Sequence, residues 1–207
     1  MVKVVFFDYD GVLTRDKTGS LTTIRFLSAK TEIPFDSVRR ALDEHNTALN
    51  EGYVTYADVW PAICAKLKRD LPLSLLTAAF ESTPVNEAMM HVACSLKNHY
   101  SVGIITDNKK DRMDHLRQHQ RLADVFAPII VSADVHCTKA SRAIFEYALS
   151  RLSVHPRESV FIDNTASNLR APAAIGMKTV YFDDERNDVP GLVRYLSGQF
   201  GISADGR

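Results

Sequence analysis

Two aspartates near the amino terminus, Asp8 and Asp10, are the first residues whose types and spacing could do chemistry. They follow an almost unbroken apolar run at residues 2–7, which predicts a strand buried on both faces of a parallel sheet. Residues two apart in an extended segment point the same way, so both carboxylates are expected on one side, just beyond the strand. Two like charges this close are unfavourable unless a cation neutralises them or one carboxyl keeps a proton. The pair is therefore the first indication of a functional site.

A turn with two solvated aspartates, or a calcium-binding loop, would also explain this segment. An EF-hand loop needs Gly at its sixth position and Glu at its twelfth, whereas here Gly11 is fourth from Asp8 and Gly19 is twelfth. The calcium loop is therefore excluded. On this segment alone, the solvated turn and the functional site both remain open.

The composition limits the possible partners. The chain has 207 residues, enough for one domain with or without a small insertion. Lys plus Arg and Asp plus Glu both number 25, so no overall field favours nucleic acid or an anionic membrane. Apolar runs are too short for a membrane span or a signal peptide, and we expect a cytoplasmic protein. The three widely spaced cysteines predict neither a disulfide framework nor a zinc site.

Residues 15–84 contain no convincing strand and predict an all-helical insertion. Pro34 opens a segment with helical spacing that ends near Asn50, and His45 lies on its apolar stripe, where a core position is expected. Thr55 is the expected amino-terminal cap of a further helix, and residues 74–80 predict another.

From Pro84 onward, strands and helices alternate. Apolar runs predict strands at 102–105, 129–131, 160–162 and 179–182, and a last helix at 189–196. Repeated βα units imply an α/β fold with a doubly wound, Rossmann-like parallel sheet and all carboxyl ends of the strands on one edge. We expect the sheet domain to comprise residues 1–14 and 85–207, with a polar, frayed tail after Gly201.

Polar residues interrupt these strands at their carboxyl ends, where open α/β sheets bind ligands. In their order and spacing they resemble the motifs of the haloacid dehalogenase (HAD) superfamily, most of whose members are phosphatases. Asp8-Tyr9-Asp10-Gly11-Val12-Leu13-Thr14 resembles the first motif, Thr106-Asp107-Asn108 the second, Lys139 the third and Phe161-Ile162-Asp163-Asn164 the fourth. The helical insertion lies where this superfamily carries a C1 cap. Taken alone, Thr106 and Asp163 could each cap a following helix.

The resemblance implies a Mg²⁺-dependent phosphoric monoester hydrolase that acts on a small phosphorylated metabolite. Asp8 would attack phosphorus and form an aspartyl-phosphate. Asp10 would protonate the leaving oxygen and later take a proton from water, and the nearby Asp8 would help it to keep its proton. Mg²⁺ would be held by Asp8, the Asp10 carbonyl and Asp163. Thr106 and Lys139 would complete the catalytic set.

The substrate would contact Thr106, Asp107 and Lys139 in the sheet domain. In the cap, candidates for specificity are Arg15, His45, Tyr53, Tyr56 and Trp60, with Arg15 foremost because it directly follows the first motif. We expect a monomer or a homodimer that binds neither nucleic acid nor a membrane.

The sequence also departs from the superfamily pattern. Asn164, Ser167 and Asn168 occupy positions where a second acid is frequent, so metal binding would be weaker. Asp107 adds a negative charge that the pattern does not explain. Three alternatives stay open: a metal-independent 2-haloacid dehalogenase, which generally lacks the second Asp, a phosphosugar mutase, and a non-catalytic binding protein on the same scaffold.

Overall fold

The computed structural model describes residues 1–203, so residues 204–207 of the predicted frayed tail lie outside the described part. The prediction is wrong for Ile202, which is buried in a hydrophobic core. One parallel sheet has the strand order β3-β2-β1-β4-β5. Its strands are β1 (Val4–Phe7), β2 (Ser101–Thr106), β3 (Ile129–Val131), β4 (Ser159–Asp163) and β5 (Lys178–Tyr181). The predicted doubly wound α/β sheet is confirmed. The first strand is central, so its carboxyl end lies between the ends of β2 and β4.

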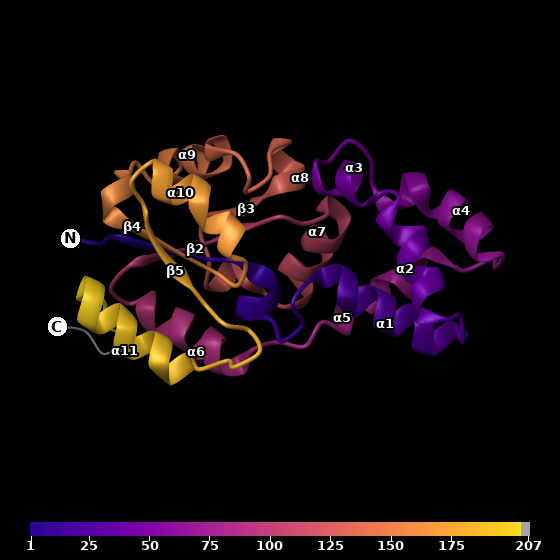
Figure 1. Cartoon of the computed structure of the whole chain (residues 1–207), viewed down its shortest axis with the longest axis horizontal. Coiled ribbons are helices and arrows are strands. Elements are labelled where there is room, and N and C mark those ends of the chain that lie inside the picture. Colours follow the sequence, from indigo (N-terminus) through magenta and orange to yellow (C-terminus); the bar gives the residue numbers. More distant parts are fainter. Residues whose placement is uncertain (204–207) are drawn as a thin grey trace.

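Alternate residues of β1 enter two different hydrophobic cores, one on each face of the sheet. Val5 and Phe7 belong to the core that includes α6 (Glu87–Leu96), α7 (Lys110–His119) and α11 (Val189–Phe200). Val4 and Phe6 belong to the core beneath α9 (Arg142–Ser150) and α10 (Arg170–Ala174). Figure 1 shows these two helical layers on either side of the strands. A strand buried on both faces has no polar alternation, which explains the continuous apolar run.

Short helical turns complete the sheet domain at the ends of strands. They are η1 (Tyr9–Leu13), η2 (Leu122–Asp124), α8 (Ser132–Val135), η3 (Pro156–Glu158) and η4 (Ala166–Leu169). The turn η1 directly follows β1 and contains Gly11 in a left-handed conformation, with a φ of 78°. This turn carries the chain from the first strand into the helical insertion.

The insertion between β1 and β2 consists of helices, as expected. They are α1 (Gly19–Thr31), α2 (Phe35–Asp43), α3 (Asn46–Asn50), α4 (Tyr56–Leu67) and α5 (Leu73–Glu81). Figure 1 shows them together beyond the carboxyl ends of the strands. The segment that enters the insertion and the segment that leaves it lie side by side, because Thr14 and Val85 form an antiparallel bridge. Within residues 1–203, no helix is both long and apolar enough to cross a membrane.

The structure corrects one detail of the insertion and confirms another. The helix expected from Pro34 to Asn50 is broken at Glu44 and His45, so α2 and α3 are separate. The break lets α3 lie against α8, where the Ser132 hydroxyl donates to the Asn50 carbonyl at 2.6 Å. His45 is consequently half-buried at the junction, not a core residue. Thr55 does cap α4, through a reciprocal capping box with Asp58.

Candidate active site

Asp8 and Asp163 are held together by one buried ammonium group. Asp8 directly follows β1, and Asp163 is the last residue of β4. Because these strands are parallel neighbours, both residues lie at the carboxyl edge of the sheet. Lys139 Nζ lies 2.8 Å from Asp8 Oδ2 and 2.7 Å from Asp163 Oδ2, and all three side chains are buried. The structure therefore brings together three of the predicted site residues, from the first, third and fourth motifs.

This triad is short of positive charge. Burial raises the pKa of Asp8 to about 8, and Asp163 adds to that effect while Lys139 opposes it. Burial lowers the pKa of Lys139, but the two carboxylates outweigh burial and raise it. A single ammonium cannot neutralise two buried carboxylates, so the triad favours a further cation or a proton.

Two neighbouring residues orient the triad. Asp107 Oδ1 accepts a hydrogen bond from the Lys139 backbone N–H at 2.8 Å, which fixes the loop that carries Lys139. This contact explains the acid at position 107, and burial raises the pKa of Asp107. Asn168 Nδ2 donates to both carboxylate oxygens of Asp163, at 3.3 and 3.2 Å. Asp163 also accepts from the Thr165 backbone N–H at 2.7 Å, so it begins the next turn as well as facing Lys139.

Asp10 is paired with a different cation, Arg112 on α7. Arg112 Nη1 lies 2.8 Å from Asp10 Oδ2 and Nη2 lies 2.9 Å from Oδ1, and Arg112 is only 1% exposed. Asn108 Nδ2 adds a further hydrogen bond to Asp10 Oδ2 at 2.8 Å. A bidentate guanidinium stabilises the ionised carboxylate. The expectation was that the main charged neighbour of Asp10 is the anionic Asp8. The structure instead places a cation, Arg112, in direct contact with Asp10.

Arg112 and Lys109 are site residues that sequence reasoning missed. Both belong to the segment Asn108-Lys109-Lys110-Asp111-Arg112, which directly follows the second motif. A cation three residues into a helix that starts at a ligand-binding sheet edge points back toward that edge, and this signal could have identified Arg112.

Two glycines allow close packing around Asp10. A Cβ at Gly11 would lie 2.1 Å from Asn164 Nδ2, in addition to the left-handed backbone there. A Cβ at Gly19 would lie 2.2 Å from Arg112 Cζ, so any side chain at the start of α1 would displace the guanidinium. Position 19 therefore lets the helical insertion approach the buried Asp10–Arg112 pair.

A cavity of about 350 Å³ lies between the sheet edge and the insertion. Its walls include Asp8, Asp10, Thr106, Asp107, Asn108, Lys109, Lys139, Asn164, Thr165 and Asn168 from the sheet domain, and Lys17, Thr18, Gly19, Ser20, Asp43, Asn46 and Asn50 from the insertion. Thr106 is buried there and is not a helix cap, because α7 begins at Lys110 with Lys109 as its cap residue. A second hollow of about 420 Å³, between β5 and α11, contains none of the predicted site residues.

Lys109 is the buried cation of this cavity nearest the insertion. Its Nζ donates to the Ser20 hydroxyl at 3.0 Å, across the boundary between the two parts of the chain. Burial lowers the pKa of Lys109 to about 8, and the neighbouring Arg112 acts in the same direction. The ammonium therefore lacks a carboxylate partner at hydrogen-bond distance among the described residues.

The expected specificity residues of the insertion do not reach the cavity. Arg15 is exposed and does not line it, so the geometry gives no support to a substrate contact there. Tyr56 and Trp60 are buried within the insertion, and Tyr53 stacks on His136 outside the cavity. His45 lies near the wall but is not part of it. Instead, polar residues at the start of α1 and on α3 line the part of the cavity that the insertion forms.

The family is decided by comparison with known proteins. The family model for haloacid dehalogenase-like hydrolases matches residues 2–176. The chain belongs to this family. It is thus an HAD-family hydrolase with the α/β fold that the motifs predicted.

The proteins to which this HAD-family hydrolase is similar include enzymes of different kinds. It is 25% identical over 221 residues to bifunctional epoxide hydrolase 2 of Rattus norvegicus, covering 96% of this chain and 40% of that protein. The chain thus spans less than half of this relative. An HAD-family enzyme from Bacteroides thetaiotaomicron has a TM-score of 0.74 at 16% identity, over 92% of this chain and 98% of that one. A 2-haloacid dehalogenase from Pseudomonas syringae pv. Tomato has a TM-score of 0.63 at 19% identity, over 88% and 87%.

Proposed function

We propose that this HAD-family hydrolase is a Mg²⁺-dependent phosphatase of a small phosphorylated metabolite. The observation that carries the proposal is the presence of two carboxylates beyond β1, one in contact with Lys139 and the other with Arg112. A nucleophile and a separate acid–base group are what phosphoryl transfer through an aspartyl-phosphate needs. The Bacteroides thetaiotaomicron enzyme, which shares the fold, was crystallised with magnesium and inorganic phosphate.

The residues present fit a magnesium ion. Mg²⁺ prefers oxygen ligands and keeps several waters, and Asp8 and Asp163 offer two carboxylates that already converge on one cation. Burial, with a smaller effect from Asp163, raises the pKa of Asp8, and a bound cation would favour its ionised form. The Asp10 carbonyl would complete the protein ligands. When bound, the ion would neutralise charge on the nucleophile and the phosphoryl group. Asn168 is neutral, so we expect modest affinity for the ion.

In the first step, an Asp8 carboxylate oxygen attacks phosphorus and the bond to the leaving oxygen breaks. Lys139 and the Thr106 hydroxyl stabilise the charge that develops on the phosphoryl oxygens. Asp10 supplies the proton to the leaving oxygen, and for this it must carry a proton and exchange an Arg112 contact for the leaving group. In the second step, the ionised Asp10, the form that Arg112 stabilises, takes a proton from the water that hydrolyses the aspartyl-phosphate.

We further propose that residues 15–84 act as a cap on a sheet domain formed by residues 1–14 and 85–207. The insertion contributes seven residues to the cavity wall, and a cavity of about 350 Å³ suits a small substrate. Lys17 and Lys109 add positive charge beyond the phosphoryl position. A small metabolite with a second anionic or strongly polar group therefore fits this cavity best.

The experiment that tests the proposal is phosphate release from p-nitrophenyl phosphate and from sugar and nucleoside phosphates, with Mg²⁺ and with excess chelator. We expect release that requires Mg²⁺ and is greatest for one class of small phosphate ester. Metal-independent halide release from chloroacetate, without phosphate release, would instead establish the dehalogenase alternative. Asp10 argues against that outcome, because a dehalogenase does not need the second carboxylate.

A further inference from the structure

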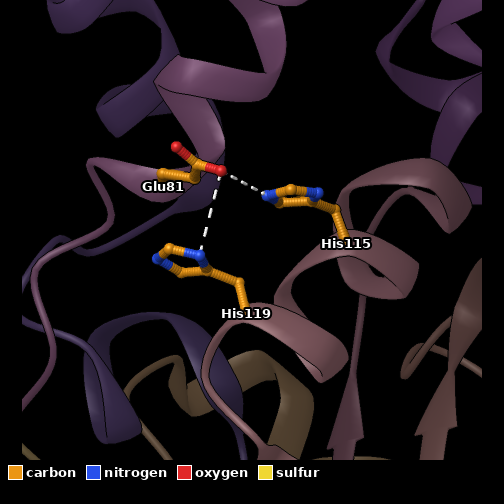
Figure 2. A group of neighbouring side chains, drawn as sticks. All are labelled: Glu81, His115 and His119. Atoms are coloured by element: carbon orange, nitrogen blue, oxygen red, sulfur yellow. Dashed lines mark hydrogen bonds and ion pairs between the residues drawn. The ribbon is translucent and has the colours of Figure 1, made fainter.

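A group of three metal-binding side chains lies on the surface, away from the catalytic carboxylates. Glu81 ends α5, and His115 and His119 lie four residues apart on α7, so both imidazoles project from the same face of that helix. Figure 2 shows both rings directed toward the Glu81 carboxylate. His115 Nε2 lies 3.0 Å and His119 Nδ1 3.8 Å from the same atom, Glu81 Oε1.

The geometry is close to that of a metal site. Zinc bound at about 2.0–2.1 Å to each ligand in a tetrahedron separates its ligand atoms by about 3.4 Å. The distances of 3.0 and 3.8 Å from Glu81 Oε1 lie on either side of this value, and all three ligand atoms lie within 4.8 Å of one another. The two imidazole rings are stacked, with centroids 5.7 Å apart and planes 18° apart. Small side-chain rotations would place all three atoms around one ion.

The chemistry of the ligands selects the class of ion. Two imidazoles and one carboxylate favour Zn²⁺, Co²⁺, Ni²⁺ or Cu²⁺, whereas Mg²⁺ and Ca²⁺ prefer oxygen ligands alone. Three protein ligands leave a position for water, and all three residues are accessible from solvent. The catalytic edge offers carboxylate, hydroxyl and amide groups instead of imidazoles. The Glu81, His115 and His119 group and the carboxylates at the sheet edge would therefore bind different metals.

We propose that Glu81, His115 and His119 form a binding site for one zinc-class divalent ion that fastens α5 to α7. The first helix belongs to the insertion and the second to the sheet domain. The same junction already contains a polar contact, because Arg112 Nη2 donates to the Thr83 hydroxyl at 3.2 Å. Thr83 is two residues beyond Glu81, and Arg112 is one turn before His115. An ion here would restrain movement of the insertion next to the residue that holds Asp10.

The first test measures Zn²⁺ binding to the full chain by calorimetry, in excess Mg²⁺. We expect one Zn²⁺ site in the wild type, weakened by about 10- to 100-fold or more in His119→Ala and in Glu81→Gln. Glu81→Gln keeps the shape and a hydrogen-bond acceptor but removes the charge. His99→Ala removes an exposed imidazole outside the group and serves as the matched control, so it should bind Zn²⁺ as the wild type does. The three free cysteines are present in every variant and cannot produce this difference.

Equal Zn²⁺ affinity in the wild type, His119→Ala and Glu81→Gln would overturn the site and leave an ordinary Glu–His ion pair. The second test addresses the fastening by amide hydrogen exchange at the end of α5. Zn²⁺ should slow this exchange in the wild type and in His99→Ala but not in His119→Ala. Unchanged exchange in the Zn²⁺-bound wild type would overturn the fastening. Neither readout requires phosphatase activity, so failure here is distinct from failure of the proposed function.

Discussion

Asp8 and Asp10 are two residues apart and border the same cavity, yet they lie in opposite electrostatic environments. Asp8 shares one ammonium with Asp163, and its pKa is raised to about 8. Asp10 is paired through both carboxylate oxygens with the Arg112 guanidinium, and it also accepts a hydrogen bond from the Asn108 amide. The first carboxylate is short of positive charge and the second is fully compensated.

The difference arises because the two partners come from opposite faces of the sheet. Lys139 precedes α9, which covers one face, whereas Arg112 is on α7, which covers the other. The carboxyl end of a central strand is the place where side chains from both helical layers can meet. The comparison teaches that two acids two residues apart can have very different amounts of compensating charge. Each helical layer supplies the cationic partner of one aspartate.

The largest effect on turnover is expected when Asp8, which shares its cation with Asp163, is replaced. Asp8→Asn keeps the size of the side chain but removes the proposed nucleophile, so we expect kcat for Mg²⁺-dependent phosphate release to fall by about 10⁴-fold or more. Steady-state assays and a melting curve measure turnover and folding together. Asp70→Asn, at an exposed position, is the matched control and should leave turnover unchanged. Activity near the wild-type level in Asp8→Asn would disprove the nucleophile assignment.

Asp10→Asn tests the other half of the comparison, because it removes the carboxylate that Arg112 holds. We expect a loss of about 10²- to 10⁴-fold with alkyl and aryl phosphates, whose leaving oxygen needs a proton. The loss should be smaller with acyl phosphates, whose leaving group needs little protonation. Measuring kcat/KM for both classes separates these cases. An equal loss on both would remove Asp10 from the role of general acid.

Arg112→Ala should reveal how much the compensated pair contributes to stability. The substitution leaves the Asp10 carboxylate buried without its cation, and breaking such a pair costs about 3–5 kcal/mol. Urea unfolding at neutral pH measures this change. Arg117→Ala on the same helix is the control, since its partner Asp134 and Arg117 itself are each 28% exposed, and it should cost about 0–1 kcal/mol.

A double variant sharpens this test. In Asp10→Asn, Arg112→Ala the uncompensated charge is gone, so the double variant should be more stable than Arg112→Ala alone. If Arg112→Ala and Arg117→Ala lose the same small amount, the Asp10–Arg112 pair does not hold the carboxylate as the structure implies.

The sequence predicted the elements that repeat simple patterns and the residues that end them. Apolar strands and their polar ends located Asp8, Thr106 and Asp163 on one sheet edge, because right-handed βα units place the carboxyl ends of all parallel strands on the same edge. It did not locate Arg112, since which face of a polar helix is buried depends on tertiary packing. It also did not foresee the break between α2 and α3, where a contact between Ser132 and the Asn50 carbonyl prevails over helical periodicity.

The side chains that the sequence suggested for specificity do not line the cavity, and the structure gives a physical reason for this. Arg15 was favoured because it directly follows the first motif, but the chain turns at the Thr14–Val85 bridge and leaves Arg15 exposed. Large side chains such as Trp60 were favoured for contacts, but they fill the core of the insertion. Polar residues at the ends of α1, α2 and α3, such as Thr18, Asp43 and Asn46, line the cavity instead.

The smallest expected effect concerns Lys109, which lies beside the Asp10–Arg112 pair and has no carboxylate at hydrogen-bond distance within residues 1–203. Its pKa is lowered to about 8, so the side chain is an ammonium below pH 8 and becomes neutral as the pH rises through that value. A phosphate ester is already fully ionised there, since its second pKa is about 6. For a substrate with a further anionic group, KM should therefore rise by about tenfold between pH 7 and pH 9.

Lys109→Met should have the high KM at both pH values, because it has no proton to lose. Lys17→Met serves as the control on the exposed side of the cavity and should keep the pH dependence of KM. If KM in Lys109→Met rises with pH as in the wild type, the titrating group is elsewhere and Lys109 does not contact the substrate.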